Sequence, residues 1–251
     1  MCVDIGYKSA LGPDGLPKYI PGIKIDRSIS EADVSVPHIP AHARPSCVVV
    51  ASNTEGAFVT KLSWGFVADF MVNSDTLRAK YANQLFNARV EKIKERSSLW
   101  NPYLSHRCLL VASGVYEHQA VEYSKKKVPH FISLASGELL LIPSLFNPTT
   151  NSFALITRPA NSLFKEIHNA GPNKHRMPLL LPPNLASGWV NQHLSEKEIA
   201  AFFDYELDSG VLCHHTVYSI RSSTPRPDGR LANEFFSWAP NETSPDQLSL
   251  F

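Results

Sequence analysis

The sequence predicts an α+β fold with many short strands and few helices. Apolar segments with strand character recur along the chain, whereas apolar residues at helical spacing occur in only a few places. The length of 251 residues, with 43% hydrophobic and 19% charged residues, suits one large or two small globular domains around a buried core. We expect one domain over residues 1–238 and a tail over residues 239–251.

The predicted strands begin after a long connection. Residues 8–45 are rich in proline and glycine and are predicted to form an ordered surface connection. The strand over 107–117 is interrupted at Gly114, where a bulge or a close backbone approach is expected. The segments 129–134 and 138–142 are expected to form a meander around a Ser-Gly turn. The other predicted strands lie over residues 47–51, 57–66, 153–157 and 213–220.

Helical signals are confined to three places. Leu77, Tyr81 and Leu85 recur at helical spacing, and Ser74 or Asp75 could cap the start of a helix over residues 74–86. Asn161 is expected to cap a short helix over 162–168, and a Ser-Glu capping box at residues 195–198 opens a third helix. The predicted helices are therefore short and separated by strands.

Composition excludes several classes of protein. The formal net charge of +1 means that any nucleic-acid-binding surface must be a local patch. The four cysteines are far apart and form no CxxC pair, which argues against a zinc site and a disulfide framework. No apolar run approaches the roughly 18 residues of a membrane span. We therefore expect a cytoplasmic protein without a metal ion or another cofactor.

Cys2 stands where removal of Met1 would expose it as the N-terminal residue. Its amine and thiol would then lie on adjacent carbons and could convert an aldehyde into an imine and then a thiazolidine. Their reference pKa values, about 7.7–8.0 and about 8.5, leave each group partly nucleophilic near neutral pH. On this residue alone, an incidental cysteine at position 2 is the competing interpretation.

Two other groups allow either a structural or a catalytic interpretation. Glu117 follows an apolar strand, so it is either a solvated edge residue or a carboxyl with a raised pKa. His168 ends a predicted helix and either caps it or takes part in catalysis. His214 and His215 would point to opposite sides of a strand, which argues against a shared metal ion.

Several segments, taken in order, resemble the SOS-response-associated peptidase (SRAP) family, which senses abasic sites in single-stranded DNA. The segments are Met1-Cys2, NAR at 87–89, RCLLVASGVYE ending at Glu117, and ITRPANSLFKEIH followed by HRMPLLL; Trp64-Gly65-Phe66 is similar to the family's Trp-Gly-Leu element. The resemblance covers roughly residues 1–238. It implies a strongly curved, mainly antiparallel sheet or barrel with short helices at its edges.

The resemblance also implies catalytic roles. Cys2 would form a thiazolidine with the ring-opened abasic sugar, and Asn87 would lie beside that sugar. Glu117 would act as general acid and base, and His168 would assist ring opening and reversal of the crosslink. His168 is preferred to His175 because Ile-His follows the helix as in the family, although the loop between this histidine and Arg176 is longer here.

DNA contacts are expected from Arg89, Trp64, Arg176 and Lys92, with core packing as the alternative for Trp64 and a solvated surface as the alternative for Lys92. Two departures from the family pattern concern the DNA surface. Asp4 replaces an arginine and would put an anion near phosphates, and His118 replaces a tryptophan that could stack on a base.

The tail changes to the polar composition PNETSPDQ before its apolar end. Its last five residues are similar to the pentapeptide with which bacterial repair proteins bind the DNA polymerase sliding clamp. Clamp binding is therefore expected, with packing of the tail on its own domain as the alternative. The clamp-binding residues would be Gln247, Leu248, Leu250 and Phe251.

The leading hypothesis is a nucleoid-associated, monomeric DNA-damage-response enzyme that covalently traps abasic sites in single-stranded DNA. A thiol peptidase that uses Cys2, limited to removal of Met1 or acting on other chains, is the second interpretation. A non-covalent reader of modified bases is the third.

Overall fold

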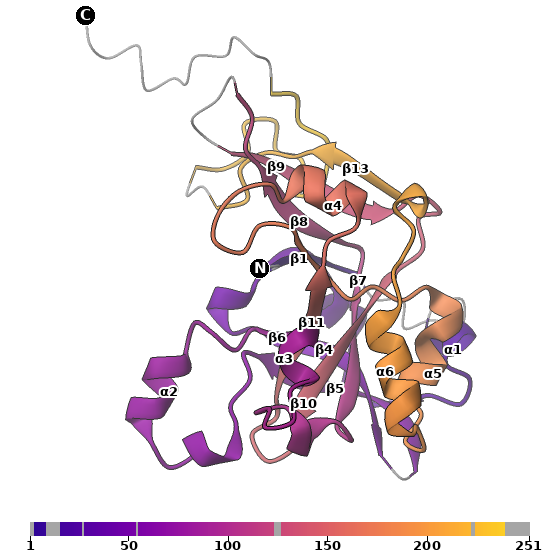
Figure 1. Cartoon of the computed structure of the whole chain (residues 1–251). Helices are drawn as coiled ribbons and strands as arrows, with labels where there is room; N and C mark the ends of the chain where they lie inside the picture. The colour runs from indigo at the N-terminus through magenta and orange to yellow at the C-terminus, as the bar shows by residue number, and fades with distance from the viewer. Residues whose placement is uncertain are drawn as a thin grey trace, which may run out of the picture.

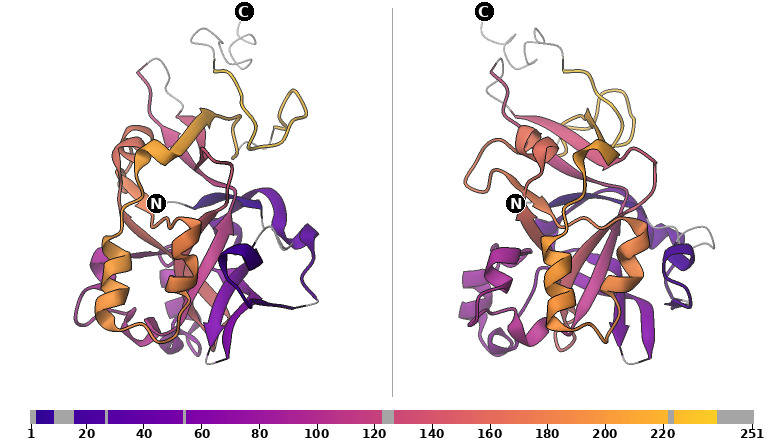
Figure 2. Two further views of the ribbon diagram at one scale, coloured as in Figure 1. Left: turned by 90° about the vertical axis from the view of Figure 1, so that its right-hand side faces the viewer. Right: turned by 45° about the vertical axis from the view of Figure 1, so that its right-hand side comes forward.

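The computed structural model describes residues 3–8, 16–26, 28–53, 55–122, 127–221 and 224–238. Met1, Cys2 and the tail residues 239–251 lie outside this part, and so do the four predicted clamp-binding residues. Two curved sheets lie one above the other, and short helices flank the lower sheet (Figures 1 and 2). Within the described residues, every helix is too short or too polar to cross a lipid bilayer.

The larger sheet closes into a barrel. Strand β11 pairs with β10 on one side and, in parallel, with β5 on the other, through Ser152↔Ser63 and Phe153↔Trp64. Because β5, β4, β7 and β10 also pair in turn, these strands form a closed ring, as expected. The strands are β2 (Lys24–Ile25), β4 (Ser46–Asn53), β5 (Gly56–Trp64), β6 (Asn87–Arg89), β7 (Arg107–Ala112), β10 (Leu140–Asn147), β11 (Ser152–Pro159) and β12 (Arg176–Pro178).

The smaller sheet is antiparallel and continues the chain from the barrel. Ser113 separates β7 from β8, and β8 then leaves the barrel for the second sheet. A side chain at Gly114 would put its Cβ 2.4 Å from the Phe131 ring and 2.6 Å from the Ile132 carbonyl oxygen, so the predicted close approach is confirmed. The strand order is β13 (Leu212–Thr216), β9 (Val128–Leu134), β8 (Gly114–Gln119), β1 (Asp4–Lys8) and β3 (Ser35–Pro40).

Three features of the sheets differ from the prediction. The expected meander is wrong, because β9 and β10 belong to different sheets. The connection over residues 8–45 contains the strand β3 at the edge of the smaller sheet. Proline has no amide N–H to donate, and an edge strand can contain Pro37 and Pro40 because one of its sides has no partner strand. Strand β1 was not predicted, and it carries the N-terminal segment into the middle of the smaller sheet.

The predicted helices are present with their caps. Helix α2 (Asp75–Tyr81) is shorter than predicted and begins where the Ser74 hydroxyl accepts from the Leu77 amide. Asn161 caps α4 (Ser162–Ile167), and Ser195 and Glu198 form the capping box of α6 (Glu196–Asp204). The remaining helices are α1 (Leu16–Tyr19), α3 (Val90–Ile93), α5 (Ala186–Trp189) and the 3₁₀ turns Glu31–Val34, Ala41–Ala43, Asp69–Met71, Asn101–Tyr103, Pro183–Leu185 and Ser209–Val211.

Candidate active site

Glu117 is a buried carboxyl group. It lies on β8, its residue is only 5% exposed, and its Oε1 has no hydrogen-bond partner among the described residues. Burial raises the pKa of Glu117 to about 8, because the apolar surroundings disfavour the charged form. The group is therefore mainly protonated at neutral pH and can donate a proton. Of the two interpretations of Glu117, the solvated edge residue is wrong.

His168 lies beside Glu117 at the C-terminal end of α4. Its Nδ1 donates to the Arg176 carbonyl oxygen at 2.9 Å, which leaves Nε2 as the nitrogen with the lone pair. Burial is the main cause that lowers the pKa of His168, so the ring is neutral. Nδ1 lies 3.7 Å from Glu117 Oε2. Since the acid is protonated and the base is neutral, this contact joins two uncharged groups and is not an ion pair.

The structure distinguishes the two candidate histidines. His175 is exposed and adopts a left-handed backbone conformation with φ of 60°. Its amide donates to the His168 carbonyl oxygen at 2.8 Å, so it closes the loop that follows α4. Of these two histidines, His168 is the one buried next to Glu117, and the geometry therefore favours His168 over His175 as the reacting histidine.

Asn87 is a buried amide without a partner. It begins β6, which lies parallel to β11 with Asn87 opposite Leu155. The residue is 5% exposed, and neither its Oδ1 nor its Nδ2 has a hydrogen-bond partner among the described residues. An unsatisfied buried amide destabilises the fold by about 1–3 kcal/mol, so a ligand that bonds to it would recover this free energy.

The basic residues expected to contact DNA differ in their availability. Arg89 is exposed, and its Nη2 donates to the Asn173 side-chain oxygen at 2.5 Å. Lys92 is exposed and pairs with Glu95 at 2.6 Å, a type of surface pair that contributes little to stability. Arg176 is mostly buried, and its guanidinium forms two hydrogen bonds with the Glu91 carboxylate and two with Thr157. A phosphate could reach Arg176 only by displacing Glu91.

Trp64 is not a DNA contact. Its side chain is fully buried, stacks on Phe153 with ring centroids 6.2 Å apart, and donates from Nε1 to the Phe86 carbonyl oxygen at 3.0 Å. The expectation that Trp64 contacts DNA is wrong because no part of the ring reaches the surface. Its hydrogen bond instead fixes the residue that precedes Asn87.

Asp4 does not present an anion to a ligand either. The residue is 2% exposed, and its carboxylate binds the His38 Nε2 at 2.9 Å and the Arg221 guanidinium. These partners outweigh burial and lower the pKa of Asp4. The charge of Asp4 is therefore paired inside the protein and is not presented at the surface.

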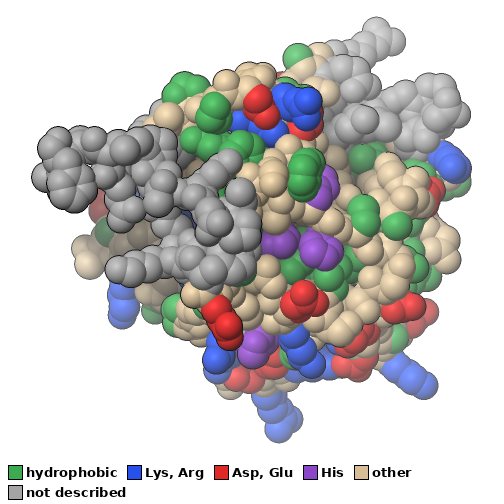
Figure 3. Space-filling model, turned by 90° about the horizontal axis from the view of Figure 1, so that it is seen from above, with side chains coloured by type: hydrophobic (Ala, Val, Ile, Leu, Met, Phe, Trp, Pro, Cys, Tyr) green, Lys and Arg blue, Asp and Glu red, His purple; other side chains and the backbone are tan. Residues whose placement is uncertain are grey.

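Two polar features near the site were not predicted from the sequence. His130 pairs with Glu117 across β8 and β9, and its Nδ1 lies 3.1 Å from His214 Nδ1. Lys127 precedes β9. Burial is the main cause of the pKa shifts of Glu117 and His168; the charge of Lys127 opposes the raised pKa of Glu117 and adds to the lowered pKa of His168. The run of three lysines at 125–127 was the available signal for Lys127. Figure 3 shows histidine side chains near the centre of the face seen from above.

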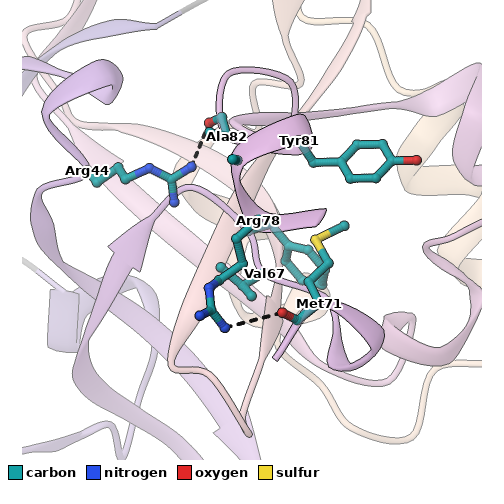
Figure 4. Close-up of a pocket in the computed structure, with 8 residues that line it drawn as sticks. Arg44, Val67, Met71, Arg78, Tyr81 and Ala82 are labelled. Atoms are coloured by element: carbon teal, nitrogen blue, oxygen red, sulfur yellow. Dashed lines mark hydrogen bonds between the residues drawn. The ribbon is translucent and has the colours of Figure 1, made fainter. Parts of the chain in front are cut away.

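Two hollows lie elsewhere on the surface. A pocket of about 260 Å³ is bounded by Arg44, Arg78, Met71 and Tyr81 (Figure 4). Both arginines there donate to backbone carbonyls, of Ala82 and Met71 respectively, and so serve the packing of α2. A second pocket of about 480 Å³ is lined by Leu134, Glu138, Pro182, Tyr205, Leu207 and Val211, among others. Neither contains Asn87, Glu117 or His168.

The predicted site residues thus lie in different places. His168 contacts both Glu117 and Arg176, and Asn87 and Arg89 lie on β6, on the other side of β11 from β12. Lys92 is at the surface, and Trp64 is in the core. Cys2 lies outside the described residues. Within those residues, no group of three histidines, cysteines or carboxylates could hold a metal ion.

Comparison with known proteins adds a family and a fold. The sequence pattern described as "SOS response associated peptidase (SRAP)" matches residues 29–219. A crystal structure of a protein from Bacteroides thetaiotaomicron, 22% identical, has a TM-score of 0.72 over 93% of this chain and 97% of that chain. At this identity the likeness concerns the fold alone, and it agrees with the observed curved sheets and short helices.

The curated relatives share one description. "Abasic site processing protein YoqW" of Bacillus subtilis (strain 168) is 29% identical over 139 residues, which are 52% of this chain and 56% of that protein. "Abasic site processing protein YedK" of Escherichia coli (strain K12) is 30% identical over 121 residues, 45% of this chain and 50% of that protein. The matches therefore span about half the length of these relatives.

Proposed function

Because the chain belongs to the SOS response associated peptidase (SRAP) family, we propose that it processes abasic sites in DNA, and specifically that Cys2 traps them covalently in single-stranded DNA. The names of the relatives support abasic DNA as the substrate. The observation that carries the proposal is the pair Glu117 and His168, a protonated carboxyl and a neutral imidazole buried side by side. Such a pair can transfer protons in both directions near neutral pH.

The course of β1 supports the involvement of residue 2. Strand β1 pairs with β8 through Ile5↔Val115 and Gly6↔Gly114. Continued by two residues, this antiparallel register brings Val3 opposite Glu117. The Cα atom of Cys2 is about 3.8 Å from that of Val3, whatever conformation the terminus adopts. The start of β1 thus supports the proposal that the aminothiol reacts beside the carboxyl group of Glu117.

In the proposed reaction, the abasic sugar first opens to its aldehyde. Glu117 donates a proton to the ring oxygen, and the Nε2 of His168 accepts the proton of the C1′ hydroxyl. The Cys2 amine then adds to the aldehyde carbon, and one of its protons moves to the oxygen to give a hydroxyl. The Glu117 carboxylate takes the second amine proton and passes it to that hydroxyl, which leaves as water and gives an imine. Finally the Cys2 sulfur adds to the imine carbon while its proton passes to nitrogen, so that one water molecule is lost overall.

Asn87 and Arg89 would hold the DNA for this reaction. The unpaired amide of Asn87 can accept from and donate to sugar oxygens, which would satisfy both of its buried polar atoms. Arg89 is exposed two residues further along β6 and can bind an adjacent phosphate. The same strand would therefore bind the sugar and the backbone next to it.

The test is incubation with single-stranded DNA that carries one abasic site. We expect an adduct that survives heating in denaturant, whose mass equals protein without Met1 plus DNA minus one water molecule. Cys2→Ala should form no such adduct, and neither should wild-type protein with a tetrahydrofuran site, which has no aldehyde. Absence of a Cys2-dependent adduct would refute the proposal.

Peptidase chemistry is the second candidate, because the family description contains that activity. Its minimal form is removal of Met1 by the chain itself, with Cys2 as the nucleophile and the Glu117–His168 pair as proton donor and acceptor. Intact mass after expression in cells that lack methionine aminopeptidase activity would test it. Retention of Met1 under these conditions would exclude self-processing and would leave the crosslinking proposal intact.

A further inference from the structure

Residues 169–175, which we name the 169–175 loop, connect α4 to β12 and are tied on both sides of the candidate site. The Asn169 side chain accepts from the Ala120 amide at 2.8 Å and donates to its carbonyl oxygen at 3.0 Å. At its other end, Asn173 accepts from the Arg89 guanidinium. The loop therefore bridges the connection after β8 and strand β6, and His168 lies at its start.

The shape of this loop is set by its backbone. The Lys174 amide donates to the Gly171 carbonyl oxygen at 3.2 Å, and the His175 amide donates to that of His168. Gly171 and His175 have φ of 91° and 60°, conformations that form the turn and that L-residues rarely adopt. The loop is thus held in one conformation by local bonds and by Asn169 and Asn173.

Three cations lie along the 169–175 loop. Arg89 binds its Asn173, Lys174 belongs to it, and Lys127 has its Nζ 3.6 Å from the position that a Cβ on Gly171 would occupy. Lys127 and Lys174 are both exposed. Lys127 immediately precedes β9, whose His130 lies opposite Glu117 on β8, so this cation is close to the candidate site.

The two acids that follow Arg89 along the chain are bound to other bases. Glu91 forms its two hydrogen bonds with Arg176, and Glu95 pairs with Lys92. The bond that Arg89 makes to Asn173 is to a neutral amide. On the face seen from above, basic and acidic side chains lie next to one another along the rim, outside the part covered by grey atoms (Figure 3).

We propose that the 169–175 loop, with Arg89, Lys127 and Lys174, is a phosphate-binding wall for the backbone of the single-stranded DNA that enters the site. This proposal rests on the proposed function. A DNA strand whose abasic sugar meets Asn87 and Glu117 must pass the loop, because the loop spans from Ala120 to Arg89 beside them. Exposed cations held on a rigid loop bind phosphates without regard to base sequence.

The test measures non-covalent affinity for a labelled single strand with a tetrahydrofuran site, between 50 and 200 mM salt. For single strands, each phosphate contact contributes about 0.7 to the slope of log affinity against log salt. K127Q/K174Q should therefore lower the magnitude of the slope by about 1.4 and the affinity at 0.1 M salt by about 25-fold. K24Q/K61Q removes the same charge from β2 and β5, where Lys24 pairs with Glu55, and should leave the slope unchanged.

The outcomes separate this inference from the proposed function. If wild-type protein forms the Cys2-dependent adduct but K127Q/K174Q keeps the wild-type slope, the phosphate-binding wall is refuted and the proposed function stands. An equal loss of slope in K24Q/K61Q would also refute it, because the effect would then be one of net charge. If wild-type protein neither binds nor crosslinks DNA, both proposals fail.

Discussion

Replacing Glu117 with glutamine should remove a pH dependence of stability that the buried carboxyl imposes. The pKa of Glu117 is raised from 4.5 to about 8 by burial, so the folded protein binds this proton more tightly than the unfolded chain does. The stability linked to this group is fully present below pH 4.5 and is lost as the pH rises through about 8. Glutamine has nearly the same shape and does not titrate.

The magnitude follows from the raised pKa. At about 1.4 kcal/mol per unit, the rise from 4.5 to about 8 corresponds to about 5 kcal/mol. Histidines titrate in both proteins, so their contribution cancels in the difference between the variant and the wild type. Of the linked free energy, about 2 kcal/mol is lost between pH 6.5 and 8. The free energy of unfolding of Glu117→Gln minus that of the wild type should therefore increase by about this amount from pH 6.5 to 8.

Urea unfolding at intervals of half a pH unit would measure this difference. Glu122→Gln changes an exposed carboxyl that precedes β9 and should follow the wild-type curve throughout. Parallel curves for the wild type and Glu117→Gln between pH 6 and 9 would show that Glu117 ionises normally, and the argument for a proton donor at this position would fail.

Other substitutions test neighbouring parts of the site. Asn87→Leu replaces an unsatisfied buried amide with an apolar side chain of similar size, so it should raise the free energy of unfolding by up to about 1–3 kcal/mol while it lowers the crosslinking rate at least tenfold; a loss of stability would contradict this. Gly114→Ala would place a methyl group against the Ile132 carbonyl oxygen and should destabilise the fold by about 1–3 kcal/mol or more in denaturant unfolding; an unchanged midpoint would refute the tight packing of β8. Trp64→Phe loses the hydrogen bond to the Phe86 carbonyl oxygen, so it should lower the free energy of unfolding by about 1–3 kcal/mol and lower the melting temperature accordingly. The DNA affinity of the folded variant should stay within about twofold of the wild-type affinity. The crosslinking rate should fall above a pH of about 8 as Glu117 loses its proton, and a rate that keeps rising to pH 9.5 would exclude it as the acid.

The fold class followed from local patterns because those patterns report local physics. The strands around residues 47–51 and 153–157 and the caps at Ser74, Asn161 and Ser195 depend on neighbours within a few positions. Strand pairing does not. The assignment of β9 and β10 to different sheets depends on which apolar face meets which core, so the expected meander failed although both strands exist.

The Cys2 aminothiol suggested aldehyde chemistry from its residue type, whereas the roles of Asn87, Glu117 and His168 followed from the resemblance of their segments to a family. Tertiary structure decided the properties that depend on surroundings. It buried Glu117 beside His168, left Asn87 without a partner among the described residues, and bound Arg176 to Glu91. It also placed Trp64 in the core, although this residue was expected at the DNA-binding surface. Protonation state and availability depend on dielectric surroundings and on partners distant in sequence, which only the folded chain brings together.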